Sequence, residues 1–270
     1  MAADEDLKSE IAELKRRLLE LEDRQNSEAE KSNAIAAEVE KNRISSLIPE
    51  KAALKSEFGL GPAASSVYRV KQGLSIGGYG EGSYTNFLGS DRRDQTDLQR
   101  LITYVGYKFS DSILFNSEIE FEHGTTDGIG GEDGDSAGEV SVEFAYLDFL
   151  LSDEANARVG NVLIPLGFVN EIHEPPYFHG VQRPFLERTI IPSTFRENGV
   201  GLFGKLGSEV EYRTYFVNGL RASRFEDSGI REGRQSGNRA LFEDFAWTGR
   251  VDYTPEEISG LTLGGATFLG

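Results

Sequence analysis

The chain of 270 residues contains no cysteine, and Met1 is its only methionine. The absence of cysteine excludes disulfides and thiolate metal sites, and it marks neither an oxidising nor a reducing compartment. The sequence also lacks any run that approaches the roughly 18 apolar residues of a transmembrane helix. We therefore predict no membrane-spanning helix.

Basic residues are in the minority, because 28 Lys and Arg face 45 Asp and Glu for a net charge of −17. This charge argues against nucleic acid as a partner and against general affinity for anionic lipid surfaces, although it permits locally basic pockets. Met1 leads into an acidic stretch, without the basic start and apolar segment of a secretory signal. If the chain is exported, we expect its numbering to begin near the mature terminus.

Segments that alternate apolar and polar residues begin near Leu74. One such segment sets Ile113, Phe115, Ile119 and Phe121 against Asn116, Glu118, Glu120 and Glu122. The next sets Val140, Val142, Phe144 and Tyr146 against Glu139, Ser141, Glu143 and Ala145. A period of two predicts strands with one apolar and one wet face. We expect strands near residues 74–85, 98–109, 112–123, 139–151, 157–164, 198–206, 208–219, 243–254 and 260–270.

The connections between these strands are alternately short and long. Short ones are expected at 110–111, 152–155, 207 and 254–259, and long ones at 86–97, 124–138, 165–197 and 221–242. Outer-membrane barrels have tight turns at one end and long loops at the other, whereas a soluble β-sandwich has no reason to segregate them. Aromatic residues gather toward the predicted strand ends, where interface girdles would run: Tyr104, Tyr107, Phe109, Tyr146, Phe149, Tyr212, Tyr215, Phe216, Trp247 and Tyr253. The pattern predicts an all-β transmembrane antiparallel barrel over residues 74–270.

An α-helical segment precedes the strands. Its apolar seam has the four-three spacing of a coiled coil over Leu7, Ile11, Leu14, Leu18 and Leu21, and Ile35 and Val39 restore the seam after a polar stretch. We predict a coiled coil over residues 1–57, which we expect to be a parallel trimer; a single amphipathic helix packed on a domain is the alternative. The stretch FGLGPAASS, which begins at Phe58, predicts a linker over 58–73.

Five stretches are more specific than the strand pattern. They are GGYGEGSY (77–84), LITYVGYKFSDSILFNSEIEFEHG (101–124), GEVSVEFAYLDFLL (138–151), and NEIHEPPYFHGVQRP (170–184) with IIPSTFRENGVGLFG (190–204). Together they resemble the phosphate-selective-porin-like (porin O/P-like) group of bacterial outer-membrane porins over residues 72 to 220. The resemblance implies a Gram-negative outer-membrane barrel of about 16 strands, homotrimeric, with the coiled coil in the periplasm. Phosphate-selective members carry dense arginine and lysine in the pore, and this chain departs from that pattern.

Side chains opposite the apolar face are expected to line the lumen. They are Arg100, Lys108, Glu118, Glu120, Glu122, Glu139, Glu143, Arg158, Lys205, Arg213 and Arg250. Charged rings or ladders select solutes by charge and size. The stacked glutamates favour a cation-favouring or weakly selective pore; alternatively, the charges only pair across strands and keep the lumen wet.

The longest connection, 165–197, is expected to bend into the lumen and narrow it, because long loops in compact domains tend to be functional. Its candidate constriction residues are His173, Glu174, Tyr177, Phe178, His179, Arg183 and Arg188. His173 and His179 lack zinc-type spacing, so we expect them to dock the loop, not to bind metal. The carboxylates Asp127, Glu132, Asp133 and Asp135 lack EF-hand spacing, and we expect an exposed acidic loop. No metal, cofactor or catalytic residue is predicted.

The sequence thus predicts passive diffusion of small hydrophilic solutes or ions through an outer-membrane channel, without a chemical step. A structural protein, whose coiled coil tethers or assembles the envelope, is the alternative, and a soluble β-rich binding protein is a more distant one. Nine strands is an odd number and the sequence stops inside an apparent strand, so we expect the N-terminal part of a longer barrel.

Overall fold

The computed structural model describes residues 2–42, 56–89, 91–126, 138–227 and 229–270; in the first range it describes the side chains of 13–38. The chain divides into two compact units, residues 1–50 and 51–270. The described residues of the first form the helix α1 (Ala2–Asn42), which confirms the predicted helix. Leu14, Leu18, Leu21 and Ile35 are exposed in the single chain, and the side chains of Leu7, Ile11 and Val39 lie outside the described ones. The coiled coil itself stays a prediction.

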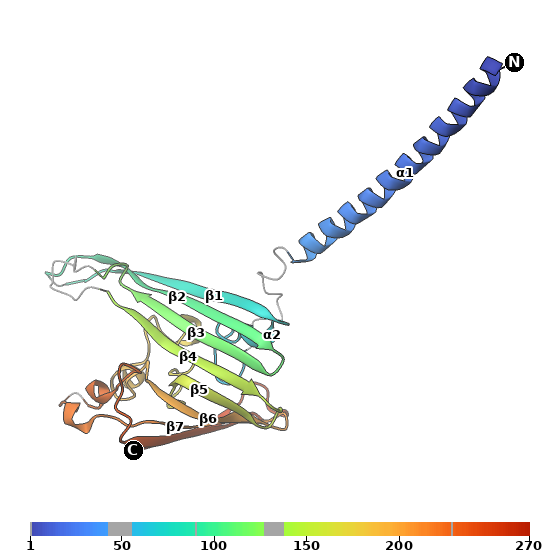
Figure 1. Cartoon of the computed structure of the whole chain (residues 1–270). Helices are drawn as coiled ribbons and strands as arrows, with labels where there is room; N and C mark the ends of the chain where they lie inside the picture. The colour runs from blue at the N-terminus through green and yellow to red at the C-terminus, as the bar shows by residue number, and fades with distance from the viewer. Residues whose placement is uncertain (1, 43–55, 90, 127–137, 228) are drawn as a thin grey trace. The chain divides into compact units, whose positions relative to one another are not determined.

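The second unit is a single antiparallel sheet of nine strands in chain order, and it confirms all nine predicted strands (Figure 1). The strands are β1 (Gly73–Thr85), β2 (Gln95–Ser110), β3 (Ile113–Glu122), β4 (Val140–Leu150), β5 (Asn156–Leu163), β6 (Arg196–Leu206), β7 (Val210–Asn218), β8 (Phe245–Tyr253) and β9 (Leu263–Leu269). The sheet is not closed, because β1 and β9 each pair with one neighbour. Among the described residues, no helix combines the length and the apolarity needed to cross a membrane.

Because neighbouring strands run antiparallel, alternate connections meet at the same end of the sheet. The connections 86–94, 123–139, 164–195 and 219–244 lie at one end, and 111–112, 151–155, 207–209 and 254–262 lie at the other. The described residues also form two short helices, α2 (Ser66–Arg69) and α3 (Phe185–Thr189), and 3₁₀ turns at Pro175–Tyr177, Ala222–Arg224 and Arg231–Gly233. The predicted alternation of short and long connections is wrong at one point. The connection 254–262, predicted to be short, is as long as 86–94, which was predicted to be long.

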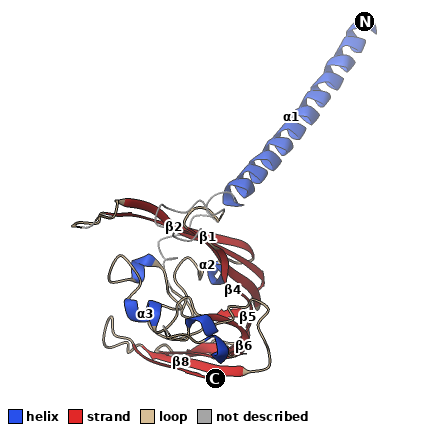
Figure 2. Cartoon of the chain, turned by 90° about the vertical axis from the view of Figure 1, so that its left-hand side faces the viewer, coloured by secondary structure: helices blue, strands red, loops and turns tan. Residues whose placement is uncertain are grey.

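One face of the sheet is apolar and exposed. The sheet curves around α2 and α3, which lie on its other face (Figure 2). On β1, Leu74 and Ile76 are 56% exposed, whereas Ser75 between them is 7% exposed. The same alternation continues on later strands, where Leu101, Val159, Leu202, Phe216 and Val251 are exposed. We call these the outer face and the inner face.

A bulge in β4 overturns part of the predicted alternation. Glu118 pairs with Phe144 and Ile119 pairs with Val142, so Glu143 is an extra residue without a partner position. The register shifts by one residue there, so that every later residue of β4 lies on the face opposite to the predicted one. Val142 lies on the outer face as predicted, but Phe144 and Tyr146 lie on the inner face, 0% and 2% exposed.

The predicted aromatic girdle is wrong at three positions. Tyr104, Tyr146 and Tyr215 are at most 3% exposed and belong to the inner core. Their phenol groups bond inner-face partners, as the hydroxyl of Tyr146 does in accepting from the Asn116 amide at 3.3 Å. The exposed aromatics Tyr107, Phe109, Phe216 and Tyr253 lie on the outer face.

The predicted linker, 58–73, is packed against the inner face of the sheet. Leu60, Ala64 and Val67 are at most 3% exposed, and Leu60 and Ala64 join the hydrophobic core. The Asn116 amide donates to the Ala64 carbonyl at 2.9 Å. Apolar residues in FGLGPAASSV therefore bury themselves beneath the sheet, so that the chain enters β1 only after filling part of the space that the sheet surrounds.

Candidate functional site

Glutamates of two neighbouring strands form the first half of the site. Glu118, Glu120 and Glu122 occupy alternate positions of β3 and share the inner face, and the bulge adds Glu143 of β4. Glu118, Glu120 and Glu143 are at most 3% exposed. We call these four residues the acidic wall; the sequence predicted them on one face.

Arginines of two connections form the second half, which we call the arginine cluster: Arg183, Arg188, Arg231 and Arg234. Arg234 donates from Nη1 to the carbonyls of Pro192 at 2.6 Å and Thr194 at 2.9 Å. Burial, with the neighbouring Arg231 and Arg196, lowers the pKa of Arg234 to about 10, so it stays charged at neutral pH. Its carbonyl partners are neutral, and its charge is therefore not cancelled by a bonded carboxylate. Arg231 and Arg234 were not predicted.

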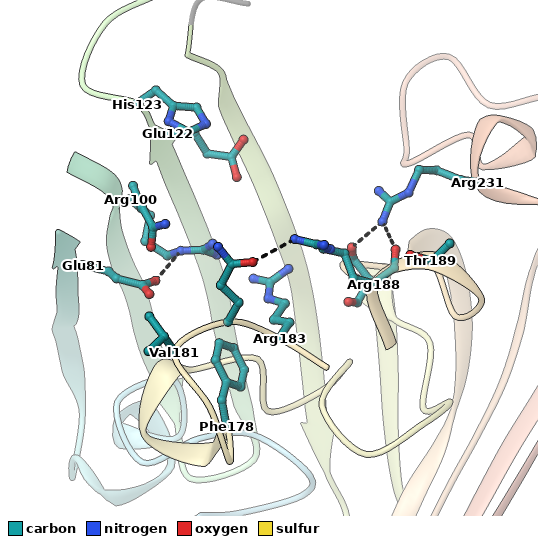
Figure 3. Close-up of a pocket in the computed structure, with 13 residues that line it drawn as sticks. Glu81, Arg100, Glu122, His123, Phe178, Val181, Arg183, Arg188, Thr189 and Arg231 are labelled. Carbon is teal, nitrogen blue, oxygen red and sulfur yellow. Dashed lines mark hydrogen bonds and ion pairs between the residues drawn. The ribbon is translucent and has the colours of Figure 1, made fainter. Parts of the chain in front are cut away.

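A cavity of about 590 Å³ lies between these groups (Figure 3). Arg100 and Glu122 line it from the sheet, and Arg183, Arg188 and Arg231 line it from the connections. A second cavity of about 220 Å³ shares Glu122, Arg183 and Arg231 and extends to Glu143 and Arg234. The two cavities place the acidic wall and the arginine cluster on facing sides of one polar space.

The charges of the site are unequally paired. Arg100 forms ion pairs with Glu81 at 2.8 Å and Glu120 at 3.0 Å, as the prediction of cross-strand pairing required. The Nε and Nη2 atoms of Arg183 are buried and have no hydrogen-bond partner in the described part of the chain. Four arginines and two glutamates line the larger cavity, so positive side chains outnumber carboxylates there despite the acidic composition of the chain.

His173 fixes the connection 164–195 to the acidic wall. Its Nε2 lies 3.1 Å from both Glu118 Oε1 and Glu143 Oε2. Burial opposes the charged imidazolium, but Glu118 and Glu143 outweigh it and raise the pKa of His173 to about 10. Glu174 beside it is also buried, and burial together with Glu118 raises its pKa. The geometry agrees with a docking role for His173.

The other predicted residues of this connection lie farther out. Phe178, Arg183 and Arg188 line the larger cavity, and the hydroxyl of Tyr177 lies 3.0 Å from that of Ser56. His179 is exposed and does not join His173. The acidic residues Asp127, Glu132, Asp133 and Asp135 lie outside the described residues.

Two polar residues that the sequence did not single out hold the base of the connection. The Asn170 amide donates to the carbonyls of Ile164 at 2.7 Å and Phe195 at 2.9 Å, and its oxygen accepts from the Phe195 N–H at 2.7 Å. The buried carboxylate of Glu187 accepts from the Phe168 N–H at 2.7 Å. These bonds satisfy backbone groups that would otherwise be buried without partners.

Arg158 lies on the inner face, as predicted, and fastens the segment 56–72 to the sheet. It forms two hydrogen bonds with Asp148, at 2.8 and 3.0 Å, and donates to the Tyr68 hydroxyl at 2.8 Å. The Tyr68 hydroxyl donates to Asp148 at 2.5 Å, and burial raises its pKa, which keeps that proton in place. The Arg158 guanidinium also lies 3.9 Å from the Tyr146 ring centroid. Arg158 is 3% exposed and Asp148 is fully buried.

The remaining predicted lumen residues are on the inner face. Arg213 forms ion pairs with Glu171 at 2.9 Å and Asp252 at 2.7 Å. Arg250 bonds the same Asp252 at 2.7 Å, and Lys205 bonds Glu57 at 2.9 Å. A further cavity of about 270 Å³ lies beside Arg213 and Arg250. Lys108 of β2 pairs with the buried Leu114 on the inner face, and Glu139, directly before β4, lines the 220 Å³ cavity.

The packing of the segment 56–72 against the sheet can be tested by a substitution at Gly106 of β2. A Cβ atom at this position would lie 2.7 Å from the Val67 side chain, closer than side chains pack. We expect Gly106→Ala to lower the free energy of unfolding by about 1–3 kcal/mol through overpacking. Gly265→Ala is the matched control, because a Cβ there has nothing within 4 Å. Equal unfolding curves for the two variants would contradict the packing described here.

Comparison with known proteins adds one relative. No protein-family model matches the chain, and no solved structure matches it. An uncharacterized protein of Aquifex aeolicus (strain VF5) is 47% identical over 232 residues, which make up 85% of this chain and 51% of that protein. The chain therefore spans about half the length of this relative.

Proposed function

We propose that the chain contributes nine strands to an outer-membrane porin of the phosphate-selective-porin-like group, a passive diffusion channel for small hydrophilic solutes or ions. One observation carries the proposal: an apolar, exposed outer face lies opposite an inner face on which the acidic wall meets the arginine cluster. The connection 164–195 supplies two of these arginines and narrows the channel. Solutes cross without a chemical step.

The outer face supports a lipid environment. Large exposed apolar residues recur on most strands of the sheet: Leu74, Ile76, Leu98, Leu101, Phe121, Val140, Val142, Val159, Val200, Leu202, Phe216, Val251, Leu263 and Leu269. Soluble monomers rarely expose a continuous apolar surface of this extent. Lipid-facing and lumen-facing residues that alternate along each strand are the expected arrangement of a membrane barrel.

Further strands complete the barrel in this proposal. Edge strands in lipid leave backbone groups unpaired at a cost of several kcal/mol each, so β1 and β9 need additional partners. A barrel of about 16 strands supplies them, and the relative that is about twice as long as the matched region has room for the others. The homotrimer, the outer-membrane location and the periplasmic coiled coil follow from the family resemblance and complete the proposal.

The channel is tested by planar-bilayer recording or liposome swelling with the full-length protein. We expect discrete conductance steps and solute entry that falls with solute size. A correctly refolded protein that gives neither would contradict the channel.

A structural role is the second candidate, because the segment 56–72 fills part of the space inside the sheet. In that case the barrel is an anchor and the coiled coil is a tether. Deletion of residues 1–50 separates the two candidates and leaves the packed segment intact. A tether loses envelope attachment, whereas a pore keeps its conductance and at most loses oligomer stability.

A further inference from the structure

Three side chains that are far apart in the sequence meet beneath the connection 164–195. The Nε2 atom of His173 and one carboxylate oxygen each from Glu118 and Glu143 all lie within 4.8 Å of one another. The side chains are 2%, 1% and 3% exposed. Two carboxylates and an imidazole, shielded from water, form a ligand set that zinc uses.

The orientation of His173 favours a ligand role for Nε2. Nδ1 lies 3.0 Å from the carbonyl oxygen of Asn170, which can only accept, so Nδ1 carries a proton and donates it. Nε2 then faces two carboxylate oxygens, and a cation must lie between them, either a proton or a metal ion. Metal-ligating histidines almost always donate their other N–H to a carbonyl or carboxylate in this way.

The spacing of the donor atoms also fits. Zinc bonds nitrogen and carboxylate oxygen at about 2.0–2.2 Å, which places two donors of a tetrahedral site about 3.3 Å apart. Nε2 lies 3.1 Å from each of the two carboxylate oxygens. Small side-chain shifts would admit the ion.

Hydrogen-bond partners outside the proposed site orient Glu143, whereas one carboxylate oxygen of Glu118 has no such partner among the described residues. The Glu143 Oε1 atom accepts from the Thr194 hydroxyl at 2.5 Å and from Arg196 at 3.1 Å, which leaves Oε2 turned to His173. Glu118 Oε2 is buried and has no hydrogen-bond partner among the described residues. This second observation points to a missing ligand, because unsatisfied buried carboxylate oxygens are costly.

We propose that Glu118, Glu143 and His173 bind a divalent transition metal ion of the zinc class, which replaces the Nε2 proton and links the connection 164–195 to β3 and β4. The ion offsets the two carboxylate charges, and a water molecule or Glu118 Oε2 takes the fourth position. The site depends on the folded position of the connection and not on conduction, so it and the proposed channel can fail separately.

Titration of the purified, metal-free protein with zinc chloride tests the site, with calorimetry for stoichiometry and cobalt absorption spectra for geometry. We expect one ion per chain. His173→Gln and Glu143→Gln are expected to weaken binding more than about a hundredfold, and Thr194→Val about 10- to 100-fold as loss of an outer partner. His179→Gln and His123→Gln, the other two histidines, are controls without effect.

Near-ultraviolet circular dichroism and Trp247 fluorescence show which variants keep the native fold. Absence of zinc binding to the folded parent protein would overturn the site. Binding of unchanged strength in folded His173→Gln, or equal loss in His179→Gln, would also overturn it.

Discussion

Replacement of Asp148 by alanine is expected to lower the free energy of unfolding by about 3–5 kcal/mol. The variant leaves the Arg158 guanidinium buried at 3% exposure without its carboxylate, and leaves the Tyr68 hydroxyl without its acceptor. Removal of one partner of a buried ion pair costs far more than removal of an exposed pair, because the remaining charge cannot be hydrated.

Urea titration in lipid vesicles, followed by fluorescence, measures this change. Asp153→Ala is the matched control, since Asp153 lies in the neighbouring turn and is exposed. We also expect protease to cut the segment 56–72 more readily in Asp148→Ala, because Tyr68 holds that segment to the sheet. A decrease of less than about 1 kcal/mol in the free energy of unfolding would show that the contacts among Arg158, Asp148 and Tyr68 do not hold the segment 56–72 to the sheet.

Replacement of Arg183 by glutamine is expected to shift the ion selectivity of the full-length protein toward cations. Arg183 lines both cavities of the site, and two of its guanidinium nitrogens have no described partner. One unit charge about 8 Å from a passing ion contributes roughly 0.5–2 kcal/mol for an effective dielectric constant between about 80 and 20. Because the charge repels cations and attracts anions, the two contributions add, and the cation-to-anion permeability ratio should rise roughly 5-fold or more.

Reversal potentials across a salt gradient measure the ratio. Arg224→Gln is the matched control, because Arg224 is exposed in the connection 219–244 and does not line either cavity. The shift should shrink as the salt concentration rises, since mobile ions screen the charge. An equal shift of the permeability ratio in both variants, or no shift in Arg183→Gln, would show that the arginine cluster does not lie along the ion path.

The alternation of residue types was sufficient to predict the strands and most of the inner face. Alternate residues of a strand lie on opposite faces whichever strands pair with it. Glu118, Glu120 and Glu122 were therefore correctly predicted on one face. Glu143 itself lies on the predicted face, but the prediction failed after it, because one extra residue in β4 is invisible in the pattern and reverses every position that follows. Phe144 and Tyr146 were misassigned for that reason.

The parts of the site that were missed depend on long-range contacts. Tyr68 meets Arg158 across 90 positions of sequence, and no local pattern in the segment 56–72 indicates which strand residue Tyr68 contacts. Arg234 reaches Thr194 from a different connection, so spacing along the chain cannot pair them. Asp148 did carry a signal: it is the lone charge in the run FAYLDFLL, and a carboxylate there needs a buried partner.

Contact between the outer face of the sheet and lipid can be measured at Trp247. It is the only tryptophan of this chain, it lies on the outer face of β8, and its indole N–H donates to the Thr214 hydroxyl at 2.9 Å. The fluorescence of Trp247 is the part of the signal that disappears in the variant Trp247→Phe. In vesicles of brominated lipid, quenching of this part shows that Trp247 contacts the acyl chains. The double variant Trp247→Phe with Phe268→Trp places the indole on the inner face as a control.

We expect strong quenching of Trp247 by brominated lipid, weak quenching by aqueous iodide, and little lipid quenching in the double variant. Quenching of Trp247 by iodide but not by brominated lipid would mean that the outer face lies in water, and it would contradict the membrane barrel.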